Sequence, residues 1–141
     1  MKHFDPAKPN VPLDQLSDAQ RRIAGGPVWK LDEVQRLMAA GELKSLLTPK
    51  SGSDVYIHFS WTLREVGVLF HQLQKNHFRN SQWVSLPKNP NDVYAADSYV
   101  LPKGYLPHGS VLGNDLPSVY VKFTIRSNPQ LMTFVSVHPS T

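Results

Sequence analysis

The spacing of apolar residues changes once along this chain of 141 residues, and that change restricts the fold more than any other feature. Up to about residue 80, apolar side chains recur at helical intervals, so helices are expected there. Beyond that point apolar and polar residues alternate, which is typical of strands with one buried face. Helices followed by an antiparallel sheet predict a small α+β fold, with about four strands in the C-terminal half packed on the N-terminal helices.

Two helices are predicted before the change of spacing. Residues 29–40 carry their apolar side chains on one stripe, and Gly41 is expected to cap the C-terminal end. Thr62 and Glu65 have the spacing of a capping box, so a second helix is expected from there to about residue 76. The segments between the two are expected to be a helix extension at 42–47, a loop at 48–53 and a short extended piece at 55–59.

The first 28 residues differ in composition from the rest of the chain. Four prolines surround one weakly amphipathic stretch at 13–23, and a Gly-Gly-Pro sequence follows it at 25–27. This pattern predicts an N-terminal arm, residues 1–28, with a short helix. Residues 29–141 are expected to form a single domain.

The alternating segments predict four strands, at residues 81–86, 93–101, 119–126 and 131–138. Their expected connections are a loop at 87–91, a long loop rich in Gly and Pro at 102–117, and a turn around 127–129. The last two strands form the clearest hairpin.

This hairpin brings candidate functional residues to one face of the sheet. If the apolar row faces the core, a five-residue loop pairs residues whose numbers sum to 258. Tyr120 then lies opposite His138 and Lys122 opposite Ser136, with Arg126 on the same face. A slip of one residue would move His138 to the other face. The alternative is that this row is simply the solvated side of an antiparallel sheet.

The side chains on this face match the needs of metal-free RNA cleavage. Attack of a ribose 2′-OH on the adjacent phosphate needs an acid, a base and cations that stabilise the developing charge. His138 suits the acid or base role, and Tyr120 can position the phosphate or share the proton transfer. Lys122, Arg126 and Arg79 are expected to hold phosphates.

A second basic group follows the predicted second helix: His71, Lys75, His77 and Arg79. His71 and Lys75 are four residues apart and share a helix face, and the whole group can hold phosphates. The alternative needs no ligand, because cations at the C-terminal end of a helix interact favourably with its dipole.

The chain carries 15 Lys and Arg against 11 Asp and Glu, and most of the excess follows residue 55, as a nucleic-acid surface requires.

The composition excludes several other classes of protein. The chain has no cysteine, which excludes disulfides, thiolate nucleophiles and Cys-ligated metals. No zinc or phosphate-loop motif occurs, so no metal or cofactor is expected. No apolar run is long enough for a signal peptide or a membrane span, so we expect a cytoplasmic protein without a membrane partner.

Three patches of the sequence, taken in order, are similar to one known family. They are the helix at 29–43 with its Ala-Gly ending, Asn-Asp-Val-Tyr at 91–94, and the hairpin segments at 119–124 and 134–136. They resemble the MqsR family of mRNA-cleaving toxins from bacterial toxin–antitoxin pairs. That family has the RelE/barnase-like ribonuclease architecture, so the resemblance implies the same fold here.

The resemblance also implies functional residues and partners. The family's active-site tyrosine matches Tyr120, the glutamine before its Asp-Val-Tyr segment matches Asn91, and its near-terminal lysine falls at His138. A further family lysine has no direct match, so Arg79 or Lys75 would have to serve. The implied partners are single-stranded mRNA, which is cleaved without a metal, and a cognate antitoxin that neutralises the protein.

A second class of function stays open. A non-enzymatic binding module, such as an immunity-type or adaptor protein, would use exposed Trp and Tyr residues as a protein interface. It explains the Pro-rich arm equally well and does not depend on the hairpin register.

Overall fold

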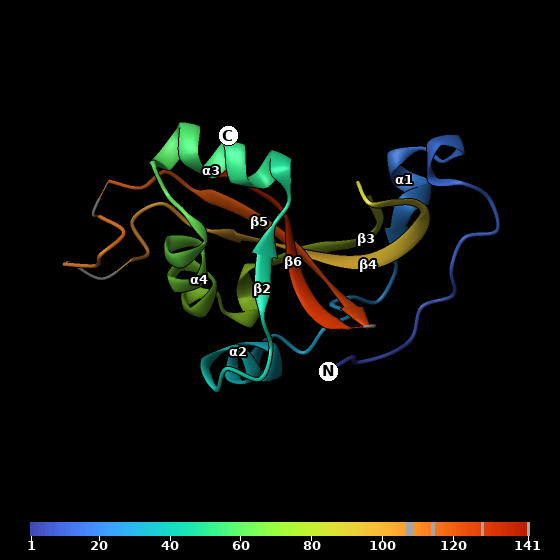
Figure 1. The fold of residues 1–141 in the computed structure, drawn as a ribbon, viewed down its shortest axis with the longest axis horizontal. Coiled ribbons are helices and arrows are strands. Elements are labelled where there is room, and N and C mark those ends of the chain that lie inside the picture. The colour runs from blue at the N-terminus through green and yellow to red at the C-terminus, as the bar shows by residue number, and fades with distance from the viewer. Residues whose placement is uncertain (107–108, 114, 128, 141) are drawn as a thin grey trace.

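The computed structural model describes residues 1–106, 109–113, 115–127 and 129–140, and it has an α+β fold, as predicted (Figure 1). The strands are β1 Arg22–Ile23, β2 Ser45–Leu47, β3 Phe78–Leu86, β4 Asn89–Leu101, β5 Val119–Ser127 and β6 Gln130–Pro139. The helices are α1 Asp18–Arg21, α2 Leu31–Ala39, α3 Pro49–Phe59 and α4 Leu63–Gln72, with the 3-10 turns η1 Leu13–Gln15 and η2 Lys75–His77. Residues 107, 108 and 114 of the predicted long loop and residue 128 of the predicted turn lie outside the described residues.

The sheet has six strands in the order β1-β3-β4-β5-β6-β2, which is more than the four expected. The four central strands are the predicted ones, paired antiparallel. The additional strands are the short edge strands β1, paired antiparallel with β3, and β2, paired parallel with β6. Segments of two and three residues are too short to show an alternating pattern, so these two strands could not be predicted from apolar spacing.

Both predicted helices are present, as α2 and α4. The capping box of α4 is formed, and the Glu65 side chain accepts a hydrogen bond from the Thr62 backbone N–H at 2.8 Å. The helix ends at Gln72 instead of near residue 76, because Leu73 adopts an extended backbone conformation and the chain then forms η2.

The predictions for residues 42–59 were wrong. Part of the expected helix extension forms β2, and the expected loop and extended piece together form α3. The start of α3 has a clear physical cause: the Thr48 hydroxyl accepts a hydrogen bond from the Ser51 N–H at 3.1 Å, and Pro49 occupies the first turn. The Ser51 hydroxyl also donates to the Phe134 carbonyl at 2.8 Å, which ties α3 to β6.

Because this cap is buried, Thr48→Ala is expected to lower the free energy of unfolding by about 1–2 kcal/mol. Thr48→Ser, which keeps the accepting oxygen, should recover most of the loss. Urea unfolding measures both variants, and Ser53→Ala in the exposed part of the same helix is the control. Equal losses for Thr48→Ser and Thr48→Ala would contradict a capping role.

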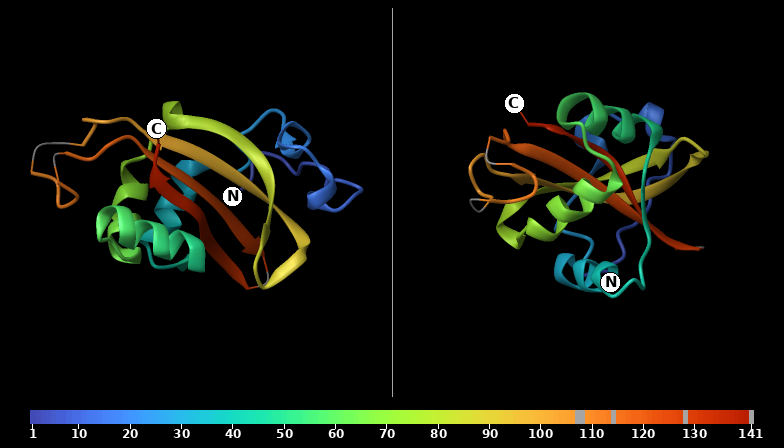
Figure 2. Two further views of the ribbon diagram at one scale, coloured as in Figure 1. Left: turned by 90° about the horizontal axis from the view of Figure 1, so that it is seen from above. Right: turned by 60° about the vertical axis from the view of Figure 1, so that its left-hand side comes forward.

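The two faces of the sheet differ in what covers them (Figure 1). The core face packs on α2 and α4, where the Phe70 ring meets the Phe123 and Phe134 rings edge-on at 5.2 and 5.7 Å. We call the opposite face, which carries Tyr120 and Lys122 of β5, the Tyr120 face. Seen from above in Figure 2, left, the strands of this face lie between α3 at one side and α1 at the other.

Candidate functional site

Tyr120 and His138 form a stacked pair on the Tyr120 face. The two residues are direct cross-strand partners, their ring centroids are 5.0 Å apart and their planes are inclined by 17°. Both side chains are half-buried, so each keeps an edge toward solvent. The predicted pairing of Tyr120 with His138 and of Lys122 with Ser136 is confirmed.

The register arises differently from the prediction. Ser127 pairs with Gln130, so the turn is shorter than the expected five-residue loop, and pairs near it sum to 257. An irregularity between Lys122 and Phe123 leaves Val135 as an extra residue on β6. This bulge shifts the pairing by one residue and restores the predicted partners at the far end of the hairpin.

Lys122 is the cation nearest to the pair. Its Nζ lies 5.8 Å from the centroid of the Tyr120 ring and donates a hydrogen bond to Oε1 of Gln82 at 2.6 Å. Burial lowers the pKa of the Lys122 ammonium, whereas the nearby Asp18 carboxylate acts in the opposite direction. Gln82 was missed by the sequence reasoning, although its place in an alternating segment was the one available signal.

The Tyr120 phenol is prepared to donate a proton in a hydrogen bond. Burial raises its pKa, and this effect exceeds the opposing influence of a hydrogen bond with Ser98 and of the Arg22 charge. The Ser98 hydroxyl in turn donates to the Asn80 carbonyl at 3.1 Å. The phenol therefore stays protonated near neutral pH, and its one proton, which Ser98 accepts here, can be donated to an anionic oxygen that takes the place of Ser98.

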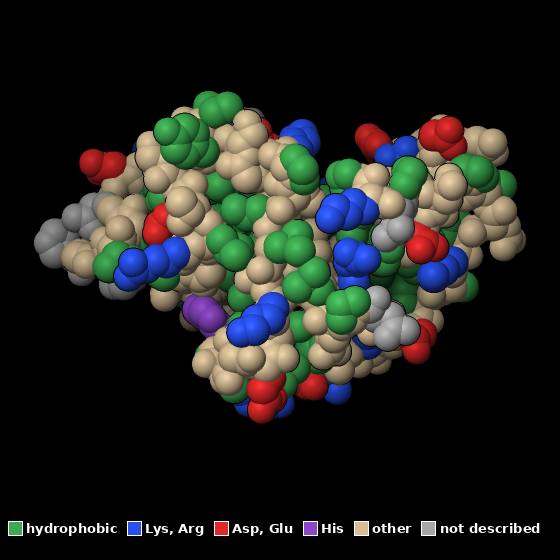
Figure 3. Space-filling view, viewed as in Figure 1, with side chains coloured by type: hydrophobic (Ala, Val, Ile, Leu, Met, Phe, Trp, Pro, Cys, Tyr) green, Lys and Arg blue, Asp and Glu red, His purple; other side chains and the backbone are tan. Residues whose placement is uncertain are grey.

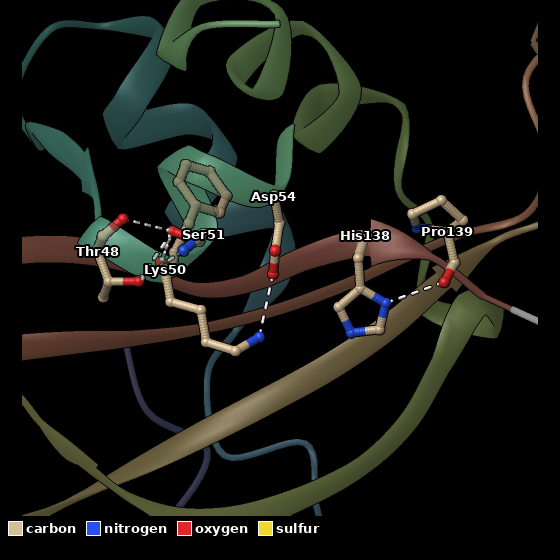
Figure 4. Close-up of polar contacts among 7 residues, drawn as sticks. Thr48, Lys50, Ser51, Asp54, His138 and Pro139 are labelled. Carbon is tan, nitrogen blue, oxygen red and sulfur yellow. Dashed lines mark hydrogen bonds and ion pairs between the residues drawn. The ribbon is translucent and has the colours of Figure 1, made fainter. Parts of the chain in front are cut away.

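The tautomer of His138 follows from its neighbour (Figure 4). Its Nδ1 lies 2.9 Å from the Pro139 carbonyl oxygen, and a carbonyl can only accept a hydrogen bond, so Nδ1 carries the proton. In the neutral ring Nε2 then holds the lone pair and can accept a proton. Figure 4 shows the Lys50–Asp54 ion pair of α3, with its N and O atoms 3.0 Å apart, on the same side of the strands.

Two other predicted site residues lie far from this pair. Arg126 is six residues along β5 from Tyr120, which is about 20 Å in a strand. It lines a separate hollow of about 690 Å³ together with Trp29 and Trp83. Asn91 is exposed near the other end of β4, nine residues from Val100, the partner of Tyr120. The structure therefore does not bring Asn91 or Arg126 to the stacked pair.

Three members of the second basic group, His71, Lys75 and His77, are also separate from the pair. His71 and Lys75 are exposed, but α4 packs on the core face, opposite Tyr120. His77 is only 4% exposed, its Nδ1 accepts a hydrogen bond from the Gln74 N–H at 3.0 Å, and burial lowers its pKa. Arg79 is exposed where the pairing of β3 with β4 is irregular, and its charge lowers the pKa of His77 further. His77 thus packs inside the fold, and a phosphate in solution does not reach it.

A large cleft adjoins the pair on the Tyr120 face. Its volume is about 1190 Å³, and the N-terminal segment at residues 8–15 forms one of its walls. Lys122, Gln82, Arg21 and Asn91 are among the residues that line it. In Figure 3 the surface is notched between α3 and α1, with Lys and Arg side chains beside the notch.

Metal sites and membrane spans were also sought. Within the described ranges, no three or more His, Asp or Glu side chains are grouped so that they could hold a metal ion. In the same part of the chain, no helix is both long and apolar enough to cross a bilayer.

No protein-family model matches the chain, and no curated protein is significantly similar to it. The geometry of the Tyr120 face and the partial resemblance in sequence are therefore the two grounds for a functional assignment.

Proposed function

We propose that the protein is a metal-independent endoribonuclease that cleaves single-stranded RNA. The observation that carries the proposal is the stacked Tyr120–His138 pair, with the Lys122 ammonium beside it on a partly exposed sheet face. These three groups supply a proton acceptor, a neutral hydrogen-bond donor and a cation, which can serve the proton transfer and the charge stabilisation in 2′-OH attack on a phosphate.

Each group has a role that follows from its surroundings. Nε2 of His138 takes the proton of the attacking 2′-OH, and the imidazolium that results gives this proton to the leaving 5′-oxygen. The Tyr120 phenol donates a hydrogen bond to a non-bridging oxygen of the phosphate. Lys122, which Gln82 holds beside the phenol, stabilises the charge that develops on the phosphorane.

The resemblance to the MqsR toxins supports the same proposal. On that basis the fold is of the RelE/barnase-like kind, the substrate is mRNA, and a cognate antitoxin neutralises the protein in the cytoplasm. The six-stranded sheet with helices on both sides is compatible with such a fold but does not by itself identify it.

The proposal is tested by incubating the purified protein with single-stranded RNA in EDTA. We expect fragments that end in a 2′,3′-cyclic phosphate, and Tyr120→Phe should lower kcat/KM by about tenfold or more because the phosphate loses one donor. Intact RNA after incubation with folded protein, checked by circular dichroism, would contradict the proposal.

A non-enzymatic binding function is favoured by one observation on α3. Tyr56 and Ile57 are adjacent, and each is 70% exposed. Large apolar side chains of this kind are common in protein interfaces. If the RNA assay fails, Tyr56→Ser and Ile57→Ser are the variants with which a protein interface should be sought.

A further inference from the structure

The cleft and the stacked pair lie on the same face of the sheet and meet at one residue. Lys122 lines the cleft, and its ammonium also lies beside the Tyr120 ring. A phosphate held by Lys122 therefore lies between the stacked pair and the cleft. An RNA strand that continues from that phosphate can enter the cleft.

The cleft is long enough for several nucleotides. Ser98 pairs with Lys122, and Asn91 lies seven residues before Ser98 on the same strand, which corresponds to about 23 Å. At about 3.4 Å for each stacked nucleotide, this length accepts at most about seven nucleotides of a single strand.

The lining of the cleft also fits an unpaired strand. Gln82 and Asn91 offer amide groups that can pair with the exposed edges of bases. The charges of the lining are balanced, with the cations Lys8, Arg21 and Lys122 beside the carboxylates of Asp14, Asp18 and Asp92. Apolar surface comes from Trp83, Val11 and several prolines. Amides and apolar groups together suit bases more than a phosphate backbone alone, and bases are accessible only in a single strand.

The wall formed by the N-terminal segment is fixed to the fold. Arg21 of α1 donates two hydrogen bonds to the Leu13 carbonyl, from Nε at 3.1 Å and from Nη2 at 2.7 Å. The His3 N–H donates to the Val28 carbonyl at 2.7 Å, and the Lys30 N–H donates to the Met1 carbonyl at the same distance. A wall attached at both ends can bind a ligand without a large cost of ordering.

We propose that this cleft holds the nucleotides that adjoin the cleaved phosphate, so that the N-terminal segment is part of the substrate site. The inference rests on the proposed function, since it assigns neighbouring nucleotides to the same site. It gives Asn91 a role in binding the RNA strand, at a distance from the reacting phosphate.

The test compares RNA substrates of increasing length with a variant that fills the cleft. For the wild type, kcat/KM should rise at least about tenfold from a dinucleotide to an octanucleotide, since each stacked or paired base adds binding energy. Val11→Trp, at a residue that lines the cleft, should abolish most of this rise. Val111→Trp is the matched control, because Val111 is 83% exposed and does not line the cleft.

A binding measurement separates this inference from the proposed function. A fluorescent octanucleotide with 2′-O-methyl groups cannot be cleaved, and its affinity should fall about tenfold in Val11→Trp but not in Val111→Trp. Absence of any cleavage with intact binding would contradict the proposed function alone. Cleavage that does not depend on length, or equal octanucleotide affinity in both variants, would overturn the assignment of the cleft.

Discussion

Replacement of Asp97 by asparagine is expected to lower the free energy of unfolding by about 3 kcal/mol. The Asp97 carboxylate is fully buried and accepts three hydrogen bonds. The donors are the backbone N–H groups of Val28 at 3.0 Å and Trp29 at 2.8 Å and the hydroxyl of Ser81 at 2.6 Å. An asparagine offers one accepting oxygen, so its NH₂ group would face a buried N–H donor.

Thermal or urea unfolding of the variant measures this loss. Asp92→Asn is the matched control, because Asp92 lies on the same strand but is exposed. The contacts of Asp97 join residues about 70 positions apart, so the segment before α2 should also lose protection from hydrogen exchange. An Asp97→Asn variant as stable as Asp92→Asn would show that these bonds contribute little.

The effect of Asp97 should also depend on pH in a defined direction. Burial raises the pKa of Asp97 above its ordinary value of 3.8, although the hydrogen bonds from Ser81, Val28 and Trp29 oppose the shift. The folded state therefore binds the proton more tightly than the unfolded chain. The tighter binding of this proton stabilises the folded state. The stabilisation is complete below about pH 3.8 and is lost as the pH rises through the folded-state pKa.

Measurement of unfolding at several values between about pH 3 and about pH 7 isolates this contribution. The difference between wild type and Asp97→Asn should shrink as the pH rises. A difference that grows with pH would mean that the carboxylate is stabilised in its charged form.

Local signals predicted two of the helices and the central strands, but not α3 or the short edge strands. The helices α2 and α4 and the strands of the closing hairpin follow from spacing and capping residues, which act within a few positions. The start of α3 carried local signals, the capping Thr48 and Pro49 in the first turn, but the Ser and Gly residues that follow favoured a loop. The contact from Ser51 to the Phe134 carbonyl, which joins residues 83 positions apart, ties this segment to β6. The strand β2 pairs with β6 and could not be predicted from its own three residues.

The candidate site was predictable where it depends on one hairpin. Tyr120 and His138 meet because two adjacent strands fix their register, and the bulge at Val135 compensated for an incorrect loop length. Gln82 comes from β3, which is not adjacent to β5 in the sheet, so its contact with Lys122 needed the order of the strands. Asn91 was predicted in the site because residues 91–94 resemble a segment of the MqsR toxins. A match in four adjacent residues does not determine how far Asn91 lies from Tyr120.

Replacement of His138 by alanine is expected to lower kcat/KM for RNA cleavage by about 100- to 10,000-fold, the usual contribution of a general acid or base. Lys122→Met keeps most of the side-chain volume and removes the charge, and should cost about 100-fold. Neither change should unfold the protein, because both side chains keep an edge toward solvent. Initial rates with a fluorescent RNA in EDTA measure both variants.

If His138 transfers a proton, a substitution that keeps its positive charge should still abolish activity, which a purely structural or electrostatic role does not predict. His138→Lys keeps a cation at the position, but a lysine ammonium has no lone pair that could take the proton of the 2′-OH. This variant should therefore be as inactive as His138→Ala in the same RNA assay. His58→Ala, which changes an exposed histidine on α3, is the control and should leave the rate unchanged. Full activity of His138→Ala together with loss of activity in His71→Ala would place the chemistry on the opposite side of the sheet.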